Sequence, residues 1–360
     1  MNEQCGSNIP VFTSFDQMIA QVKPDTVIIT TIDRYHHEYI IRALESRCDV
    51  ISEKPLTVDA KQCKEVLEAE QRTGRKVRVT FNCRYMPYVV RIKELLASGV
   101  IGQIHSIHLE WFLDTSHGAD YFRRWHRKMD NSGGLLVHKS THHFDMVNWW
   151  LDDEPLELHA WGDLRFYGPN REERGGRCHT CSHARTCNFY YDITADKFTK
   201  SLYFDAESHD GYIRDACVFG DEIDIYDTMA VNVKYSKGTL LSYSLTAYNP
   251  FEGWKAVFVG DKGRMEAEHI TGKMIPDDPN EYIRYYNKAG EETTVQVRKS
   301  SGGHGGGDER LRRMLFVGDL ADPLHQQAGS LEGAMSMLIG AGANISIALG
   351  KTVVIRDLLT

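Results

Sequence analysis

Lys54 directly follows a short apolar stretch at residues 50–52 that is suited to a buried strand. It belongs to the sequence Glu53-Lys54-Pro55, in which the proline ends the strand and fixes the turn. An ammonium group at this position can hydrogen-bond a substrate hydroxyl, and partial burial would bring its pKa toward neutrality. The tripeptide alone is also compatible with an exposed lysine in an ordinary strand-to-helix turn.

A second group of reactive side chains lies in segment 133–145, Gly-Gly-Leu-Leu-Val-His-Lys-Ser-Thr-His-His-Phe-Asp. His138 and His142 are four residues apart, so a helix places them on one face, with Asp145 a further turn along. An imidazole is a suitable general base for taking a hydroxyl proton while hydride leaves the same carbon. We therefore predict Lys54 and His142 as the catalytic residues. Two alternatives remain open: histidines satisfied at a domain interface, and a divalent metal bound by His138, His142 and Asp145.

The elements around Lys54 alternate between strand and helix. Residues 26–31, 50–52 and 76–81 are runs suited to buried strands, and residues 36–46 and 60–72 have helical spacing. This order predicts a parallel, doubly wound sheet that binds ligands at the carboxyl ends of its strands.

Beyond about residue 84 the pattern changes to helices at 86–98, 134–151 and 330–349. An alternating strand is expected at 104–113, successive strands between 230 and 267, and a last strand at 353–355. Strands in succession favour a large, mainly antiparallel sheet. The predicted fold class is therefore α/β plus α+β. We predict a partial Rossmann-type dinucleotide-binding domain at residues 1–83. An α+β substrate and oligomerisation domain is expected at residues 84–360, with a cysteine-rich insertion around 168–200.

The composition excludes several classes of protein. The 360 residues are 42% hydrophobic and 26% charged, with a formal net charge of −8, so nucleic-acid binding is not expected. The polar N-terminus does not resemble a signal peptide. No run of residues is expected to approach the roughly 18 apolar residues of a membrane span. We expect a cytoplasmic protein without membrane partners.

Cys178, Cys181 and Cys187 lie close together in the polar insertion, with two histidines between them. Cys-x2-Cys is half of a common zinc motif, and a metal ion would stabilise a segment with little core of its own. A structural zinc site is one hypothesis. Free thiols in a loop are the alternative, because a second Cys-x2-Cys is missing.

Three segments carry a family resemblance when they are taken together and in order. They are Thr30-Thr31-Ile32-Asp33-Arg34-Tyr35-His36, residues 43–55 ending in Glu-Lys-Pro, and the Gly-Gly and His-x-x-Asp positions of 133–145. These segments resemble the glucose–fructose oxidoreductase, inositol dehydrogenase and MocA family (Gfo/Idh/MocA), and the likeness spans essentially the whole chain.

The resemblance implies an NAD- or NADP-dependent oxidoreductase that acts on a carbinol of a sugar, glycoside or polyol. It also implies a homo-oligomer, either a dimer or a tetramer, and proton-transfer roles for Lys54 and His142. The residues that it places at the cofactor are Thr30, Thr31, Asp33, His36, Glu53, Lys54 and Asn82.

The sequence departs from the family pattern at two places. It has no Gly-x-Gly-x-x-Gly turn, so we expect it to lack the N-terminal β-α-β unit that holds the dinucleotide pyrophosphate. His138 stands where the family commonly has Asp, and Ser140 where Gly is usual. We therefore expect an altered acid–base arrangement.

Two further segments resemble family members that cleave glycosides by transient oxidation. Residues 302–308, Gly-Gly-His-Gly-Gly-Gly-Asp, form a flexible loop whose glycines would let the backbone approach a substrate. Residues 121–126 offer aromatic rings and donors of the kind that bind sugars. A mobile surface loop and an interface cluster are the respective alternatives. The predicted substrate-binding residues are Arg84, Arg124, Trp125, His138, Lys139 and His304.

Two other functions stay open. An NAD-dependent glycosidase or lyase would oxidise the ring, eliminate the aglycone and reduce the product again, with no net NADH. A catalytically inactive sugar-binding homologue is consistent with the missing pyrophosphate turn.

Overall fold

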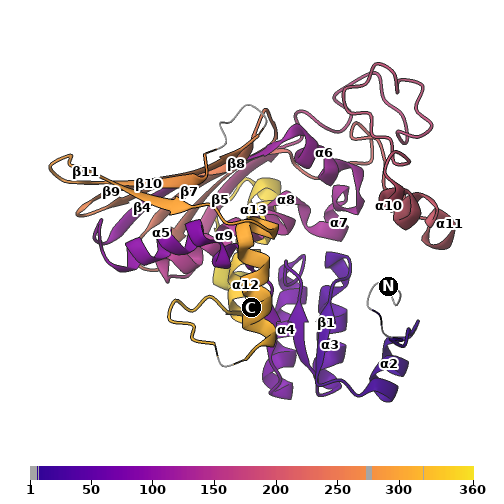
Figure 1. Ribbon diagram of the computed structural model, residues 1–360, viewed down its shortest axis with the longest axis horizontal. Helices are drawn as coiled ribbons and strands as arrows, with labels where there is room; N and C mark the ends of the chain where they lie inside the picture. Colours follow the sequence, from indigo (N-terminus) through magenta and orange to yellow (C-terminus); the bar gives the residue numbers. More distant parts are fainter. Residues whose placement is uncertain (1–5, 7, 273–277, 319) are drawn as a thin grey trace.

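The computed structural model describes residues 6, 8–272, 278–318 and 320–360. Two sheets of different size are joined by helices that lie between them (Figure 1). The smaller sheet has the strand order β1-β2-β3-β12, and the larger has nine strands. This arrangement confirms the predicted combination of a partial Rossmann-type sheet with a large, mainly antiparallel one.

The small sheet is parallel in its first three strands. Val27 pairs with Val50, and Val50 with Val77, so buried β-branched side chains lie side by side across it. The fourth strand comes from far along the chain and runs antiparallel to β3, with Ala328 opposite Val79. The strands are β1 (Thr26–Ile29), β2 (Asp49–Ser52), β3 (Val77–Val79) and β12 (Ala328–Gly329).

The helices of the small sheet have clear end signals. Asp59 caps the start of α4 by accepting from the Gln62 N–H at 2.9 Å, and Gly74 ends that helix with φ 66°. Ser14 caps α2 through the Gln17 N–H. The elements are α2 (Phe15–Val22), the 3-10 turn η1 (Asp33–Tyr35), α3 (His36–Glu45) and α4 (Ala60–Thr73).

The large sheet has the strand order β11-β10-β9-β8-β4-β7-β6-β5-β13. Among the strand pairs described for this sheet, only β4–β7 is parallel. Buried and exposed residues alternate along β6, which is the pattern of a sheet with one covered face. The sequence did not predict β5, β10 and β11. The strands are β4 (Ile104–Asp114), β5 (Pro155–Asp163), β6 (Thr228–Tyr235), β7 (Leu240–Asn249), β8 (Glu252–Gly260), β9 (Gly263–Thr271), β10 (Asn280–Asn287), β11 (Glu292–Arg298) and β13 (Val353–Val354).

Helices cover the face of the large sheet that is turned toward the small one (Figure 1). The helix expected at 134–151 is broken at Lys139 into two shorter helices. The helices and turns of this part are η2 (Asn82–Tyr85), α5 (Pro87–Ala97), α6 (Thr115–Arg123), η3 (Trp125–Arg127), α7 (Met129–Ser132), α8 (Gly134–His138), α9 (Ser140–Leu151), η5 (Gly303–Gly306), α12 (Gly307–Phe316), α13 (Ser330–Leu349) and η6 (Ile355–Leu359).

Helix α13 corrects one expectation from the sequence. Its 20 residues, with a mean hydropathy of 1.2, are long and apolar enough to cross a membrane by length and composition alone. In the fold, 61% of this stretch is buried, and the helix packs on β5, α8 and α9. Its apolar character is therefore explained by its place in the core.

The insertion connects β5 to β6 and extends away from the sheets, with long irregular stretches (Figure 1). Its base is held by Asp227, whose carboxylate accepts backbone N–H groups from Arg165, Phe166 and Tyr167 at 2.9, 2.7 and 2.9 Å. Its short helices are α10 (Lys197–Thr199), the π-turn η4 (Lys200–Phe204) and α11 (Glu207–Asp210).

Candidate functional site

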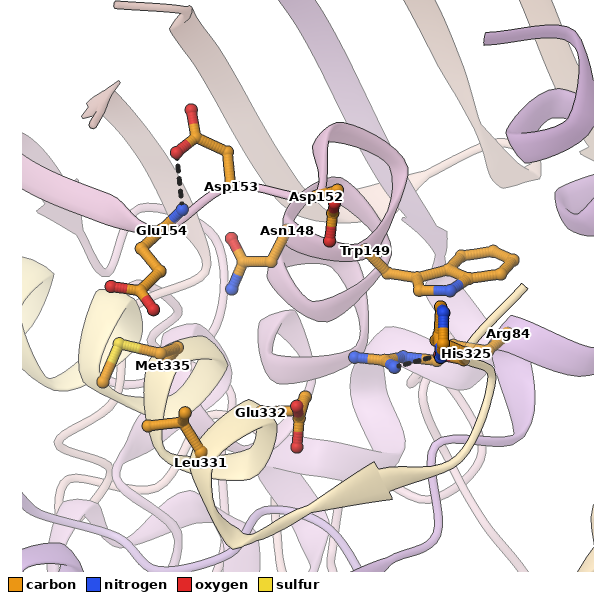
Figure 2. A pocket seen from close by; sticks show the side chains of 10 residues that line it. All are labelled: Arg84, Asn148, Trp149, Asp152, Asp153, Glu154, His325, Leu331, Glu332 and Met335. Atoms are coloured by element: carbon orange, nitrogen blue, oxygen red, sulfur yellow. Dashed lines mark hydrogen bonds between the residues drawn. The ribbon is translucent and has the colours of Figure 1, made fainter. Parts of the chain in front are cut away.

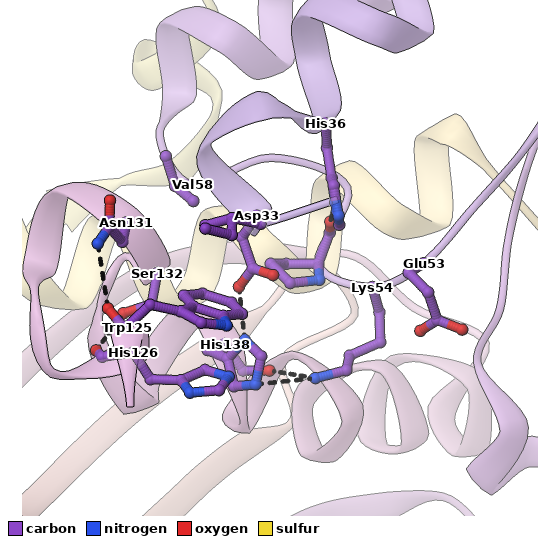
Figure 3. Close-up of polar contacts among 12 residues, drawn as sticks. Asp33, His36, Glu53, Lys54, Val58, Trp125, His126, Asn131, Ser132 and His138 are labelled. Carbon is purple, nitrogen blue, oxygen red and sulfur yellow. Dashed lines mark hydrogen bonds and ion pairs between the residues drawn. The ribbon is translucent and has the colours of Figure 1, made fainter. Parts of the chain in front are cut away.

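The candidate site lies where the carboxyl ends of β1, β2 and β3 meet helices α8 and α9. Lys54 follows β2, and Asp33 begins η1 soon after β1. His138 ends α8, and His142 lies in the first turn of α9. Strand ends and helix ends from distant parts of the chain thus place Lys54, Asp33 and His138 together (Figure 3). His142 lies against Phe81 at the end of β3, where the charge of Lys54 acts on it.

Lys54, His138 and Asp33 form a hydrogen-bonded chain (Figure 3). The Lys54 ammonium donates to the His138 carbonyl oxygen at 2.9 Å and lies 3.4 Å from His138 Nε2. His138 Nδ1 lies 2.5 Å from Asp33 Oδ2. A neutral His138 with its proton on Nδ1 satisfies both contacts, because it donates to Asp33 and accepts from Lys54.

Burial disfavours the charged form of each of these three hydrogen-bonded residues. It raises the pKa of Asp33 to about 7, although the nearby Lys54 charge acts in the opposite direction. Burial also lowers the pKa of Lys54, and it lowers the pKa of His138 well below the ordinary histidine value. A proton on Lys54 is thus less tightly held than on an exposed lysine, as proton transfer near neutral pH requires.

His142 is an imidazole of the site with one ring nitrogen unpartnered among the described residues. It is buried, it contacts the Phe81 ring edge-on at 5.9 Å, and its Nδ1 has no hydrogen-bond partner in the described part of the chain. Burial lowers the pKa of His142 well below its usual value, and the charges of Lys54 and Lys139 lower it further. The ring is therefore neutral at pH 7, which is the state of a general base.

Aromatic rings form one wall of the site. Trp125 stacks on His126 at 3.7 Å between ring centroids, and His126 meets the His138 ring at 4.3 Å. The Tyr121 ring lies edge-on to His126 and His138, at 5.4 and 5.7 Å. Segment 121–126 thus lies beside His138, and its role as a binding surface stays a prediction.

A second hydrogen-bonded chain reaches this wall from the large sheet. Glu252 Oε1 lies 2.9 Å from His117 Nδ1, and His117 Nε2 lies 3.0 Å from the Tyr121 hydroxyl. The sequence did not suggest this chain, because its members are far apart and follow no common spacing. It can orient the Tyr121 hydroxyl and exchange protons with it.

The side chains of the predicted cofactor residues differ in exposure and in hydrogen bonding. Thr30, Thr31 and Glu53 are exposed at the strand ends. Both ring nitrogens of His36 face backbone carbonyls, of Pro55 at 2.7 Å and Thr31 at 3.1 Å. His36 therefore holds the turn that presents Lys54.

The loop around His304 lies against the end of β3. The Asn82 side-chain nitrogen donates to Asp308 Oδ1 at 2.8 Å and lies 3.0 Å from His304 Nδ1. The buried Asn82 Oδ1 has no partner among the described residues. The structure thus places His304 beside a residue predicted to contact the cofactor.

These residues fit one half of a dinucleotide. The exposed hydroxyls and carboxylate at the strand ends, with the unpartnered Asn82 oxygen, can hydrogen-bond ribose hydroxyls and a carboxamide. Among the strand-to-helix turns described for the small sheet, none has the glycine pattern that holds a pyrophosphate. The fit is therefore to the nicotinamide and ribose end.

Arg84 and Asp145 are not aimed at this site. Arg84 forms a two-point salt bridge with Asp145, at 2.7 and 2.6 Å, and both are nearly inaccessible to solvent. Arg84 also lines a separate cavity of about 220 Å³ with Trp149, His325 and Glu332 (Figure 2). Asp145, although it lies on the same helix as His142, is thus bound to Arg84 and is not available to the site.

Arg124 is tied to the insertion. It reaches Asp120 at 3.2 Å, and Arg214 of the insertion binds the same carboxylate at 2.6 Å. Arg127 donates to the Cys217 carbonyl at 3.0 Å. The insertion thus supports the segment that carries Trp125 and His126.

The predicted zinc ligands come together without forming a metal centre. Cys178, Cys181, Cys187 and Cys217 line one small cavity with His183. In the ranges that the structure describes, no group of three or more His, Cys, Asp or Glu residues is arranged to hold a metal ion. The structure gives the zinc hypothesis no support, and these four cysteines are free thiols.

An oxidoreductase family model with an NAD-binding Rossmann fold matches residues 3–81, and the model of that family's C-terminal α/β domain matches residues 93–311. The putative oxidoreductase YteT of Bacillus subtilis is 41% identical over 372 residues, covering 98% of this chain and 86% of the relative.

Inositol 2-dehydrogenase of Rubrobacter xylanophilus is 30% identical over 162 residues, or 43% of this chain and 42% of that protein. The crystal structure of aldose-aldose oxidoreductase from Caulobacter crescentus, in complex with glycerol, shares the fold. Its TM-score is 0.64 at 15% identity, and the match covers 98% of this chain and 87% of that one. With both domain models matched in order along one chain, this protein belongs to the Gfo/Idh/MocA oxidoreductase family.

Proposed function

We propose that this chain oxidises a carbinol of a sugar, glycoside or polyol with NAD or NADP, using Lys54 and His142 for proton transfer. The observation that carries the proposal is the convergence of these two side chains at the carboxyl ends of the parallel strands. Inositol 2-dehydrogenase, a relative, is named for the oxidation of a polyol.

Each residue has a distinct part in this reaction. The nicotinamide, when bound, accepts the hydride from the carbinol carbon. Neutral His142 takes the hydroxyl proton, since its Nδ1 has no other partner in the described chain. Lys54 donates a hydrogen bond to the same oxygen and stabilises negative charge as the proton leaves.

His138 and Asp33 position Lys54. Where the family commonly has Asp, this chain has His138, and a carboxylate reaches that position from η1 instead. The imidazole relays the effect of Asp33 to Lys54. We therefore propose that His138 and Asp33 together replace the single Asp of the family, which is the altered acid–base arrangement expected from the sequence.

The experiment is a coupled measurement on the purified chain. Methyl glycosides, free sugars and polyols are incubated with NAD⁺ or NADP⁺, and the reduced nicotinamide is followed by its absorbance. Release of the aglycone is measured in the same samples. Reduced nicotinamide in proportion to oxidised substrate supports the proposal.

Two results would contradict it. Aglycone release without net reduced nicotinamide would identify the glycosidase or lyase instead. Sugar binding without any turnover, under conditions in which NADH binds and quenches the protein's fluorescence, would identify a catalytically inactive homologue.

We further propose that the chain is a cytoplasmic homodimer or homotetramer, assembled through the uncovered face of the large sheet. Two large apolar side chains on this face are more than half exposed, Trp161 on β5 at 57% and Leu240 on β7 at 54%. Most oligomers pair such a face with its own copy. Light scattering of the wild type and of Trp161→Glu tests this, and a monomeric wild type would contradict it.

A further inference from the structure

Lys139 is a cation without a partner in the described chain. It lies at the break between α8 and α9, only part of its side chain is accessible, and no hydrogen bond or ion pair links its ammonium to a described residue. Its one described contact is with the Trp111 ring, whose centroid is 5.7 Å from the ammonium. Largely buried ammonium groups are normally paired, because removal from water is costly.

The acids around Lys139 are already bound to other groups. Asp33 lies against His138. Glu252 lies 2.9 Å from His117 Nδ1, and its second oxygen accepts the Asp114 N–H at 2.8 Å. The third acid, Asp145, forms a salt bridge with Arg84. No described acid therefore forms an ion pair with the Lys139 ammonium, although the Glu252 carboxylate acts on it from a distance.

Lys139 stays charged at neutral pH. Burial acts to lower its pKa, but the Tyr121 hydroxyl, the Cys83 thiol and Glu252 all act to raise it, and the net shift is upward. The positive charge is thus a permanent feature of the site near pH 7.

The charge of Lys139 is close to the proposed reaction centre. Lys139 follows His138 directly, and its carbonyl accepts the His142 N–H at 3.3 Å. Its charge is also among the causes that lower the pKa values of Lys54, His138 and His142. A substrate whose hydroxyl meets His142 can therefore bring a second substituent to the Lys139 ammonium.

We propose that the substrate is an acidic sugar, a uronic acid or a uronide, whose carboxylate binds Lys139. This rests on the proposed function and names its substrate class. A carboxylate would give the Lys139 ammonium the ion-pair partner that no described residue provides. A phosphate dianion is a poorer match, since such groups are usually held by several donors, from arginine or a helix N-terminus.

The test measures binding without turnover. Calorimetry compares the methyl glycosides of glucuronic and galacturonic acid with those of glucose and galactose, and includes glucose 6-phosphate. We expect at least one acidic glycoside to bind about tenfold or more tightly than its neutral counterpart. Lys139→Met should abolish this preference, and Lys139→Arg should retain most of it. The matched control is Lys288→Met, at an exposed lysine of the β10–β11 hairpin, which should leave the preference unchanged.

Several results would overturn the inference. They are equal affinities within every acidic and neutral pair, tighter binding of the phosphate, or a preference that survives Lys139→Met in a variant with wild-type circular dichroism. Failure of the proposed function looks different. A uronide that binds through Lys139 but never yields reduced nicotinamide would remove the dehydrogenase and leave the binding class in place. Oxidation of neutral sugars without any preference for uronides would support the dehydrogenase and remove the acidic substrate class.

Discussion

At the level of single residues, the fold treats the two proposed catalytic side chains in opposite ways. Lys54 is held at its tip by His138, whereas His142 has a ring nitrogen without a described partner. A held donor and a free acceptor suit different parts of one proton transfer, because the donor must be oriented and the base must be available.

Replacement of either catalytic residue should stop turnover. Lys54→Ala and His142→Ala are each expected to lower kcat by roughly a hundredfold or more, the usual size of a general acid–base contribution. His105→Ala, at an exposed histidine on β4, is the control and should retain activity. Steady-state rates of nicotinamide reduction measure the effect. Near-wild-type rates in both variants would refute the assignment.

Asp33 should make stability depend on pH in a specific direction. Its pKa rises from 3.8 to about 7 on folding, so between these values the folded state keeps a proton that the unfolded state has released. The stability from this group is full below pH 3.8 and is lost as the pH rises to about 7, by up to about 1.4 kcal/mol per unit.

Asp33→Asn removes this titration. We expect the variant to gain stability relative to the wild type as the pH is raised from 5 to 7, as measured by urea unfolding at each pH. A constant difference between the two proteins over this range would mean that Asp33 is ionised throughout.

At the level of elements, one glycine sets the distance between two helices. A Cβ on Gly340 of α13 would lie 2.1 Å from the Leu136 carbonyl oxygen of α8, the helix that ends in His138. Because a backbone atom cannot give way as a side chain can, Gly340→Ala should cost about 3 kcal/mol or more of the unfolding free energy. Gly176→Ala is the control, since no atom lies within 4 Å of its Cβ position. Equal urea midpoints for the two variants would contradict this packing.

The insertion depends on a single carboxylate at its base. Asp227→Ala removes the acceptor of three N–H groups, and each buried donor left unpaired costs about 1–3 kcal/mol. We expect lower stability and faster proteolysis between residues 164 and 227. The control is Asp196→Ala, at the exposed cap of α10, and this variant should be digested at the wild-type rate. Unchanged digestion of the Asp227 variant would show that the insertion is held elsewhere.

At the level of the whole molecule, the two sheets share elements and should unfold together. Helix α13 packs on β5 of the large sheet, and β12, directly before it, completes the small one. Differential scanning calorimetry is therefore expected to show one transition, with equal calorimetric and van't Hoff enthalpies. Two separated transitions would show that the sheets are independent units.

Sequence patterns predicted the parts of the fold that depend on neighbouring residues. The three parallel strands, the α13 helix and four of the antiparallel strands carry their own periodicity, and so does the placement of Lys54 after β2. The strand β12 has only two residues and exists because β3 lies beside it, so no local pattern could predict it.

The site shows the same limit. The sequence motifs identified Lys54, His138 and His142, and the fold brings these three residues to the same site. The partners were not visible, because Asp33 reaches His138 from more than a hundred residues away and Arg84 reaches Asp145 from 61 residues away. Contacts between distant segments follow from packing, which a linear spacing does not contain.

The late arrival of β12 has a consequence for how the protein is made. When β3 leaves the ribosome, the residues that will cover its edge are still to be translated, and most of the chain separates the two. Throughout that time the nascent chain presents unpaired backbone groups that can join another strand. The yield of native protein in a cell will therefore depend on what shields this edge during translation, and a faster ribosome would shorten the exposure.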